Sequence, residues 1–206
     1  MSEHEKVLCF SCLNALDQHL AFDEMQSLID LFPAELKVDG VYSLFRFSQE
    51  SVIQNLLHRL KYRGDEEVGK WLGIYLARKI PVSHSKTETL VIPVPMHPSK
   101  EKMRGYNQVE VIAEGLVSSF PSWKVEKNVL ARSKGETSLT NLNRMERREE
   151  TNRLYYLKDD SLIQGKRVLL MDDVLTTGAT LIACAQLIKS ANVESLFISA
   201  IAEADK

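Results

Sequence analysis

The sequence contains no long apolar run: none approaches the ~20 residues that a membrane-spanning helix requires. It has no marked excess of charge either, because 26 basic and 28 acidic residues give a formal net charge of −2. Such a balance gives no global indication of a nucleic-acid or anionic-membrane partner. The opening residues, MSEHEKVLCFSC, are acidic and poor in apolar side chains, so we expect no secretory signal. Only three cysteines are present, which argues against disulfides and for a reducing compartment. We therefore expect a cytoplasmic protein with no membrane contact.

Two common phosphate-binding loops are absent as well. The chain has no Gly-Lys-Ser/Thr of a Walker loop and no G-x-G-x-x-G pattern. It also lacks a recognisable Ser-His or Cys-His set, an internal repeat and a low-complexity tract. The length of 206 residues suits one core with an appendage, and 44% apolar residues are ordinary for a globular protein.

What the chain does contain is an alternation of strand and helix patterns. Apolar spacing and capping signals predict helices over 51–62, from a cap at Asp65, over 107–120 and over 179–191. Buried strands are expected over 89–95, 123–131, 166–173 and 193–202. This order predicts an α/β fold with a mainly parallel central sheet flanked by helices. The Asp39-Gly40 turn is expected to separate a small N-terminal appendage, residues 1–40, from the main domain, residues 41–206.

The segment VLLMDDVLTTGAT, residues 168–180, lies where a predicted strand meets a predicted helix. In parallel sheets ligands bind at this edge, and free N–H groups at a helix N-terminus attract anions. Threonine hydroxyls and Gly178 are suited to close around a phosphate. Asp172 and Asp173 are expected at the rim of that pocket, where carboxylates accept hydrogen bonds from sugar hydroxyls. The segment thus predicts a ribose 5-phosphate site; the alternative is a plain loop with a capping Asp and turn-filling threonines.

This segment resembles the phosphoribosyl pyrophosphate loop of the type I phosphoribosyltransferases. More closely, the chain resembles the ComF family of competence-type phosphoribosyltransferase-like proteins, from about residue 41 to 203. Further segments carry the resemblance: LKYRGD (60–65), VIPVP (91–95), RGYNQ (104–108) and RMERR (144–148). The resemblance implies the type I phosphoribosyltransferase fold.

The resemblance also implies roles for individual residues. Asp172 and Asp173 would hold the ribose hydroxyls, and with Arg104 they form the implied catalytic set. The 5-phosphate would bind residues Val174, Leu175, Thr176, Thr177, Gly178, Ala179 and Thr180. The pyrophosphate side would comprise Pro95, Met96, Lys100 and Arg104, with Mg²⁺ entering through the ligand. A flexible lid over residues 132–152 would carry Arg132, Arg144, Arg147 and Arg148. Leu139 departs from the family, in which a Gln is usual, and this weakens the expectation of turnover more than that of binding.

Simpler explanations stay open for these cations. Lys100, Lys102 and Arg104 would also be ordinary charges of a solvated loop, as would the arginines of the lid. For Lys61 and Arg63 we favour the simple explanation, in which charges at a helix end complement the helix dipole.

The cysteines resemble half of a zinc site. Cys9 and Cys12 form a C-x-x-C, whereas ComF proteins commonly carry two such pairs around one zinc. A structural zinc requires four ligands, and Cys184 fits a helix core better than a metal shell. His4 and His19 have no recognisable finger spacing. We predict free thiols rather than a zinc centre.

Three functions follow from the sequence and the resemblance. The first is a phosphoribosyltransferase that transfers a pentosyl group from phosphoribosyl pyrophosphate to an unknown nitrogen acceptor. The second is a non-catalytic module that binds the same ligand. The third is a competence factor that handles single-stranded DNA during transformation, with partners in the competence machinery. Aromatic residues near basic ones would provide stacking for DNA: Tyr62, Tyr106, Trp123, Tyr155 and Tyr156.

Overall fold

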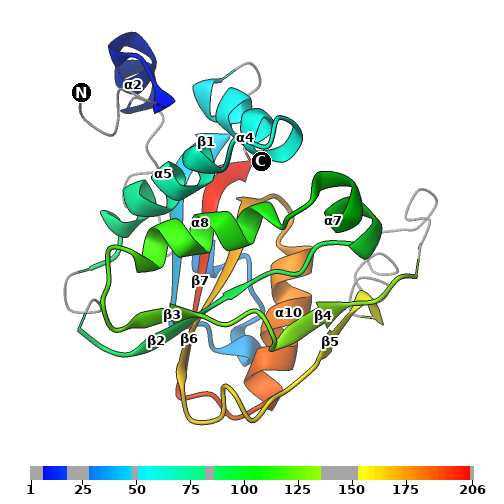
Figure 1. Ribbon diagram of the computed structural model, residues 1–206. Helices are drawn as coiled ribbons and strands as arrows, with labels where there is room; N and C mark the ends of the chain where they lie inside the picture. The colour runs from blue at the N-terminus through cyan, green and yellow to red at the C-terminus, as the bar shows by residue number, and fades with distance from the viewer. Residues whose placement is uncertain (1–6, 18–27, 48–50, 82–85, 136–152, 205–206) are drawn as a thin grey trace.

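The computed structural model describes residues 7–17, 28–47, 51–81, 86–135 and 153–204 (Figure 1). A five-stranded sheet has the order β1-β7-β6-β2-β3. Its strands are β1 (Gly40–Phe47), β7 (Ser195–Ala204), β6 (Arg167–Leu175), β2 (Thr89–Pro93) and β3 (Trp123–Val125). Every neighbouring pair is parallel. The predicted α/β fold with a parallel central sheet is therefore confirmed.

Each face of the sheet has its own hydrophobic cluster, as expected for parallel strands that are covered on both sides. In β6, Leu169 and Met171 belong to one cluster, and Val168 and Leu170 to the other. This division follows from the period of two in a strand, which sends successive side chains to opposite faces.

Three helices cover the first face: α4 (Val52–Tyr62), α5 (Glu66–Ala77) and α8 (Gln108–Val117). Figure 1 shows α5 and α8 side by side across the strands. They approach so closely at two glycines that a Cβ on Gly73 would lie 2.1 Å from the Ile112 oxygen. A Cβ on Gly115 would lie 2.2 Å from the Lys70 oxygen. Direct backbone contact thus sets the spacing of the two helices.

The helix limits follow the predicted signals with one difference. Ser51 caps α4 by accepting a hydrogen bond from the Gln54 N–H at 3.3 Å. Asp65 occupies the cap position of α5, as predicted, but its side chain makes no capping bond there. Instead, Asp65 accepts hydrogen bonds from the Arg59 guanidinium at 2.7 and 3.0 Å. A long-range ion pair has taken the place of the expected local cap.

The second face carries α10 (Ala179–Ser190) and a 3-10 helix, η1 (Ala34–Leu36). Beside α10, Figure 1 shows a separate antiparallel pair, β4 (Leu130–Arg132) and β5 (Tyr155–Leu157). Residues 123–131 were predicted as one strand, and this prediction is wrong. The Glu126 carboxylate accepts a hydrogen bond from the Asn128 N–H at 2.9 Å, and this turn divides the segment into β3 and the start of β4.

The described residues before Gly40 pack against the same two clusters. Helix α2 (Phe10–Asp17) buries Leu16 in the first cluster, while Leu28 and Phe32 lie in the second. Strand β1 begins at Gly40, next to the expected boundary. The division into an appendage and a main domain stays a prediction. Within the described part of the chain, no helix is both long and apolar enough to span a bilayer.

Candidate functional site

Residues 174–180, here called the threonine loop, join the carboxyl end of β6 to the N-terminus of α10. The loop encloses a cavity of about 60 Å³. The cavity is lined by Asp172, Val174, Leu175, Thr176, Thr177, Gly178, Ala179, Thr180 and Leu181. Gly178 is the cap residue of α10 and adopts a left-handed φ of 74°, which a side chain other than glycine rarely accepts. The small cavity at a helix N-terminus has the size and the polarity for one phosphate group.

The two carboxylates before the loop lie within β6 and not after it. As consecutive residues of a strand they point to opposite faces of the sheet. Asp172 lines the loop cavity, whereas Asp173 is only 7% exposed and faces α4 and α8. Of the two carboxylates expected at the rim of one pocket, Asp172 lines the loop cavity and Asp173 does not.

Asp172 has an unusual environment for a carboxylate. Burial, followed by the negative charge of Asp173, raises its pKa from 3.8 to about 8. The Asp173 N–H donates a hydrogen bond to Asp172 Oδ1 at 2.9 Å and opposes this rise, as do the charges of Lys61 and Arg132. The environment of Asp172 therefore favours the protonated form of this carboxyl group up to a higher pH than in a free side chain.

Asp173 is held from the helical side by two donors. Lys61 Nζ lies 2.7 Å from Asp173 Oδ2, and Gln108 Nε2 donates to the same oxygen at 2.8 Å. Lys61 lies in the last turn of α4, as a helix-end charge would, and its ammonium also pairs with Asp173. Gln108 in turn accepts a hydrogen bond from Arg104, whose guanidinium lies 5.5 Å from the Tyr62 ring centroid.

The remaining residues of RGYNQ hold Arg104 and Gln108 in place through contacts with neighbouring elements. Gly105, with a φ of 88°, ends helix α7 (Pro98–Arg104). The Tyr106 hydroxyl donates to the Leu60 carbonyl, the residue before Lys61. Asn107 caps α8 through the Val109 N–H and donates to the Val94 carbonyl at 3.0 Å. Sequence reasoning found RGYNQ only through the family resemblance and assigned no task to Tyr106, Asn107 or Gln108 in the site.

The residues predicted for the pyrophosphate side are only partly brought together. Pro95 and Met96, together with Arg132, line a second cavity of about 210 Å³ beyond the end of β2. Residues 98–104, expected as a loop, form helix α7, on which Lys100 is exposed. Arg104 points toward Tyr62 and Gln108 instead of this cavity.

Arg132 belongs to a strand and not to a loop. It is the last residue of β4, and its guanidinium lies 5.4 Å from the ring centroid of Tyr155. Its Nε is buried without a hydrogen-bond partner, which leaves a donor available beside the second cavity. The other lid residues, Arg144, Arg147 and Arg148, and the departure at Leu139, lie outside the described residues.

The cysteines lie in two separate places. Cys9 and Cys12 are at the start of α2, exposed and half-buried respectively, whereas Cys184 is buried in the second cluster. Among the described residues, no three His, Cys, Asp or Glu side chains gather in a group that could hold a metal ion. His4 and His19 lie outside the described residues, and the zinc prediction stays a prediction.

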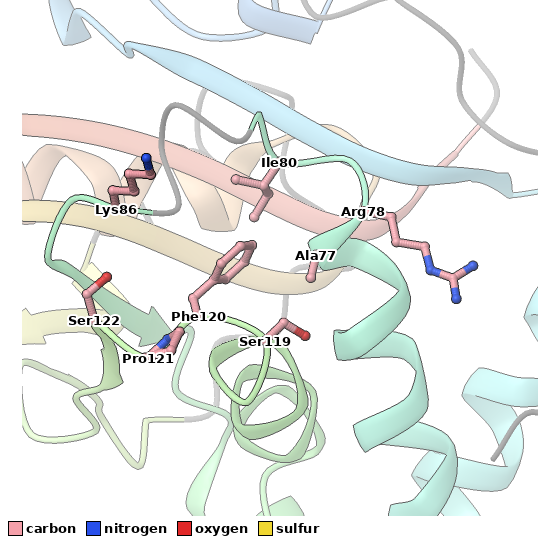
Figure 2. Close-up of a pocket in the computed structure, with 8 residues that line it drawn as sticks. All are labelled: Ala77, Arg78, Ile80, Lys86, Ser119, Phe120, Pro121 and Ser122. Carbon is pink, nitrogen blue, oxygen red and sulfur yellow. The ribbon is translucent and has the colours of Figure 1, made fainter.

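A further cavity, of about 630 Å³, lies away from these residues (Figure 2). Its lining comes from the end of α5, the α8–β3 connection and the residue Lys86 before β2. It therefore opens at the amino ends of β2 and β3, opposite to the edge that carries the threonine loop. Figure 2 shows Phe120 and Ile80 toward its centre and Arg78 pointing away. No residue predicted for the functional site lines it.

Comparison with known proteins agrees with this geometry. The family model of the phosphoribosyl transferase domain matches residues 111–205, which include the acid pair and the threonine loop. Competence protein F of Haemophilus influenzae is 27% identical over 194 residues, or 94% of this chain and 78% of that protein. Competence protein ComFC of Bacillus subtilis is 27% identical over 66% of this chain and 52% of that protein. DNA utilization protein YhgH of Escherichia coli O157:H7 is 26% identical over 65% of this chain and 59% of its own length.

Solved structures are less similar. A hypoxanthine phosphoribosyltransferase from Staphylococcus aureus is 17% identical with a TM-score of 0.40, over 68% of each chain. A glutamine phosphoribosylpyrophosphate amidotransferase from B. subtilis is 16% identical with a TM-score of 0.45, over 69% of this chain and 30% of that one.

A parallel sheet that presents an acid pair and a threonine loop at one strand end, within a matched phosphoribosyl transferase domain, defines the class. The protein is phosphoribosyltransferase-like, of type I. Its relatives indicate the branch of that class: the chain is similar to the competence and DNA utilization proteins, and the resemblance to the ComF family found in the sequence is confirmed.

Proposed function

We propose that the protein binds phosphoribosyl pyrophosphate, with its 5-phosphate in the threonine loop. The observation that supports this most is the small loop cavity: it combines a helix N-terminus, the left-handed Gly178 and the carboxylate of Asp172. Helix N–H groups and threonine hydroxyls suit the phosphate. A carboxylate on the same wall suits ribose hydroxyls, which are hydrogen-bond donors.

The pyrophosphate of this ligand would extend toward the second cavity. Arg132 would supply positive charge there, and its buried Nε has no other partner in the described structure. Mg²⁺ suits this ligand as an ion carried by phosphate oxygens and water, and it would neutralise the pyrophosphate. We assign no side chain to the ion.

The class of reaction that fits this site is pentosyl transfer to a nitrogen acceptor. The bond from the anomeric carbon to pyrophosphate breaks, and a bond to nitrogen forms. Such a reaction is catalysed by positioning and by charge, so the site needs no protein nucleophile. A non-catalytic binding module would use the same contacts and would differ only in releasing no pyrophosphate.

Calorimetry with phosphoribosyl pyrophosphate and Mg²⁺ tests the binding. We expect Asp172→Asn to weaken it roughly ten- to a hundredfold, because a lost hydrogen bond to a charged group costs ~1.5–3 kcal/mol. Gly178→Val should reduce it further, because a β-branched residue disfavours the φ of 74°. Asp160→Asn, at an exposed carboxylate, is the control and should bind like the parent. Absence of binding by the parent protein would refute the proposal.

A pyrophosphate-release screen over nucleobases and amines then separates the transferase from the binding module. Release that depends on one acceptor and is lost in Asp172→Asn identifies the transferase. Tight binding without release for any acceptor identifies the module.

A second candidate function is the binding of single-stranded DNA, in keeping with relatives named for competence and DNA utilization. The observation that favours it is Tyr62, which is 65% exposed. Its ring lies 4.8 Å from that of His58, and the Arg104 guanidinium lies on its ring as well. Exposed Arg63 follows Tyr62 in the chain, and exposed Lys100 and Lys102 lie in α7 together with Arg104. An exposed aromatic ring among cations is the arrangement on which bases stack.

A further inference from the structure

The cavity in Figure 2 lies at the edge of the sheet opposite to the threonine loop, and the proposed function gives it no task. Its volume of about 630 Å³ falls within the range of roughly 300–1,000 Å³ that is usual for small-molecule sites. The helices α5 and α8 both end at it, and Lys86 lies on the side of β2. The cavity therefore has room for a small organic ligand.

One part of the lining is apolar and well ordered. It consists of Ala77, Ile80, Phe120 and Pro121. Ile80 and Phe120 are only 5% and 7% exposed and belong to the first hydrophobic cluster. The ring of Phe120 also packs on that of Trp123, with 4.4 Å between the centroids. This part of the cavity is thus a continuation of the core, which holds its side chains in place.

The polar part of the lining is basic and hydroxylic. It consists of Arg78, Lys86, Ser119 and Ser122, and none of the described lining residues carries a carboxylate. The Arg78 guanidinium points away from the cavity and lies 4.8 Å from the ring centroid of Tyr75 (Figure 2). The ammonium of the exposed Lys86 is therefore the cation that this lining offers to a ligand.

The two helix ends at the cavity do not reverse this preference. A helix C-terminus with free carbonyl groups attracts cations. Here the carbonyls of residues 75–77 accept hydrogen bonds from the N–H groups of residues 78–80 at 2.9 to 3.3 Å. Those of residues 116–117 accept from residues 119–120 at 3.1 and 2.9 Å. The turns satisfy these carbonyls within the chain, and the ammonium and hydroxyl groups remain as donors for a ligand.

We propose that this cavity binds a small aromatic anion. A flat apolar ring system packs on Phe120 and Ile80, because aromatic rings bury much area and associate favourably with other rings. A single carboxylate pairs with the Lys86 ammonium and accepts hydrogen bonds from the serine hydroxyls at the rim, because charged hydrogen bonds are the stronger ones. The site is separate from the threonine loop and does not require that phosphoribosyl pyrophosphate binds there.

Three probes with the same ring system test the site: naphthoate, naphthamide and naphthylmethylammonium, which are negative, neutral and positive. In an NMR titration of the nitrogen-labelled parent, naphthoate should shift the backbone amides of Phe120 and Ser122 and the indole N–H of Trp123. It should bind about fivefold more tightly than naphthamide, the size of effect that one exposed ion pair produces, and the ammonium compound should bind most weakly. No shift of these signals at millimolar naphthoate, or equal affinity for all three probes, would overturn the proposal.

Four variants separate the site from unspecific binding. Lys86→Glu should reverse the order of the three probes, whereas Lys86→Arg should keep it. Ser119→Trp, at an exposed position of the rim, should weaken all three probes by filling the cavity. Lys70→Glu changes the net charge equally at an exposed lysine of α5 that does not line the cavity, and it should bind like the parent. If Lys70→Glu alters the order as Lys86→Glu does, overall charge and not this cavity governs the binding, and the proposal is wrong.

Discussion

At the scale of single residues, Asp172 is the group whose chemistry departs most from that of its free side chain. Its pKa is raised from 3.8 to about 8, so the folded protein binds this proton more tightly than the unfolded chain does. The free energy of unfolding therefore falls as pH rises from 3.8 to about 8, because the Asp172 carboxyl ionises in the unfolded chain at a lower pH than in the folded protein. We expect Asp172→Asn to remove this penalty.

Thermal unfolding of Asp172→Asn and the parent, measured in parallel from acid to alkaline pH, tests this. The Tm of Asp172→Asn should increase relative to that of the parent as pH rises, and the difference should level off above about pH 8. The exposed Asp160→Asn variant, measured in the same way, is the control for the substitution itself. A pH-independent difference for Asp172→Asn would show that the carboxyl titrates normally.

The three cysteines are expected to react in order. Hydrogen bonds from the backbone and the thiol of Cys12 lower the pKa of the exposed Cys9. The same contact raises the pKa of Cys12, and burial raises that of Cys184 well above its usual range. Since the thiolate is the reactive form, Cys9 should react first with Ellman's reagent and Cys184 only after unfolding.

Zinc content is measured on the same protein. Cys9 and Cys12 supply half of a tetrahedral shell, so we expect less than one zinc per chain by elemental analysis. Cys9→Ser should abolish the fastest thiol phase without changing the metal content. One tightly held zinc per chain, with both thiols protected until a chelator is added, would contradict this prediction.

At the scale of elements, the contact of α5 with α8 depends on two glycines. A methyl group at Gly73 or Gly115 would enter the backbone of the opposite helix, so Gly73→Ala and Gly115→Ala should each lower the free energy of unfolding by about 1–3 kcal/mol. Gly135→Ala is the control, because its Cβ would meet only Ser133 at 3.8 Å. Chemical denaturation measures all three. Unchanged stability in the helix variants would mean that α5 and α8 separate at no cost.

Elements that depend on neighbouring residues were predictable from the sequence. Helix α4 and the passage from β6 into α10 carry their apolar period, caps and loop glycine within one continuous segment. The single strand predicted over 123–131 was wrong because the Glu126 side chain forms a turn that hydrophobicity does not reveal. Helix α7 was missed because most of its residues are polar and none of them is buried.

Only the part of the site that is contiguous in the sequence was predictable. The threonine loop is contiguous in the sequence, and its cavity could be anticipated from residue types. The partners of Asp173 could not, because Lys61 and Gln108 reach it from two other elements that only the folded sheet brings together. A lysine at a helix end has the same local pattern whether it faces water or a buried carboxylate. To predict that Asp172 and Asp173 face opposite sides of the sheet, one would have to know which residues of the strand point to which face. A shift of one residue exchanges the two faces.

At the scale of the whole molecule, charge limits any binding of nucleic acid. The net charge is −2, so there is no overall attraction for a polyanion, and any contact must be local. The described aromatic candidates differ in access: Trp123 and Tyr155 are buried, whereas Tyr62 and Tyr156 are 65% and 50% exposed. Of these two, Tyr62 has an arginine on its ring and a lysine and an arginine beside it in the chain.

We therefore expect single-stranded DNA to bind weakly, with an affinity that falls steeply as salt is added, because contacts to backbone phosphates would supply most of it. Tyr62→Ala should weaken binding at low salt by ~1–3 kcal/mol if one base stacks on the ring. Tyr156→Ala removes a similarly exposed ring on β5 and should leave the affinity unchanged. Fluorescence anisotropy with a labelled oligonucleotide, repeated across a salt series, measures both effects. An abasic oligonucleotide should bind the parent as weakly as the normal one binds Tyr62→Ala. Tight binding that persists at high salt, or equal losses in the two tyrosine variants, would place the DNA contact elsewhere on the molecule.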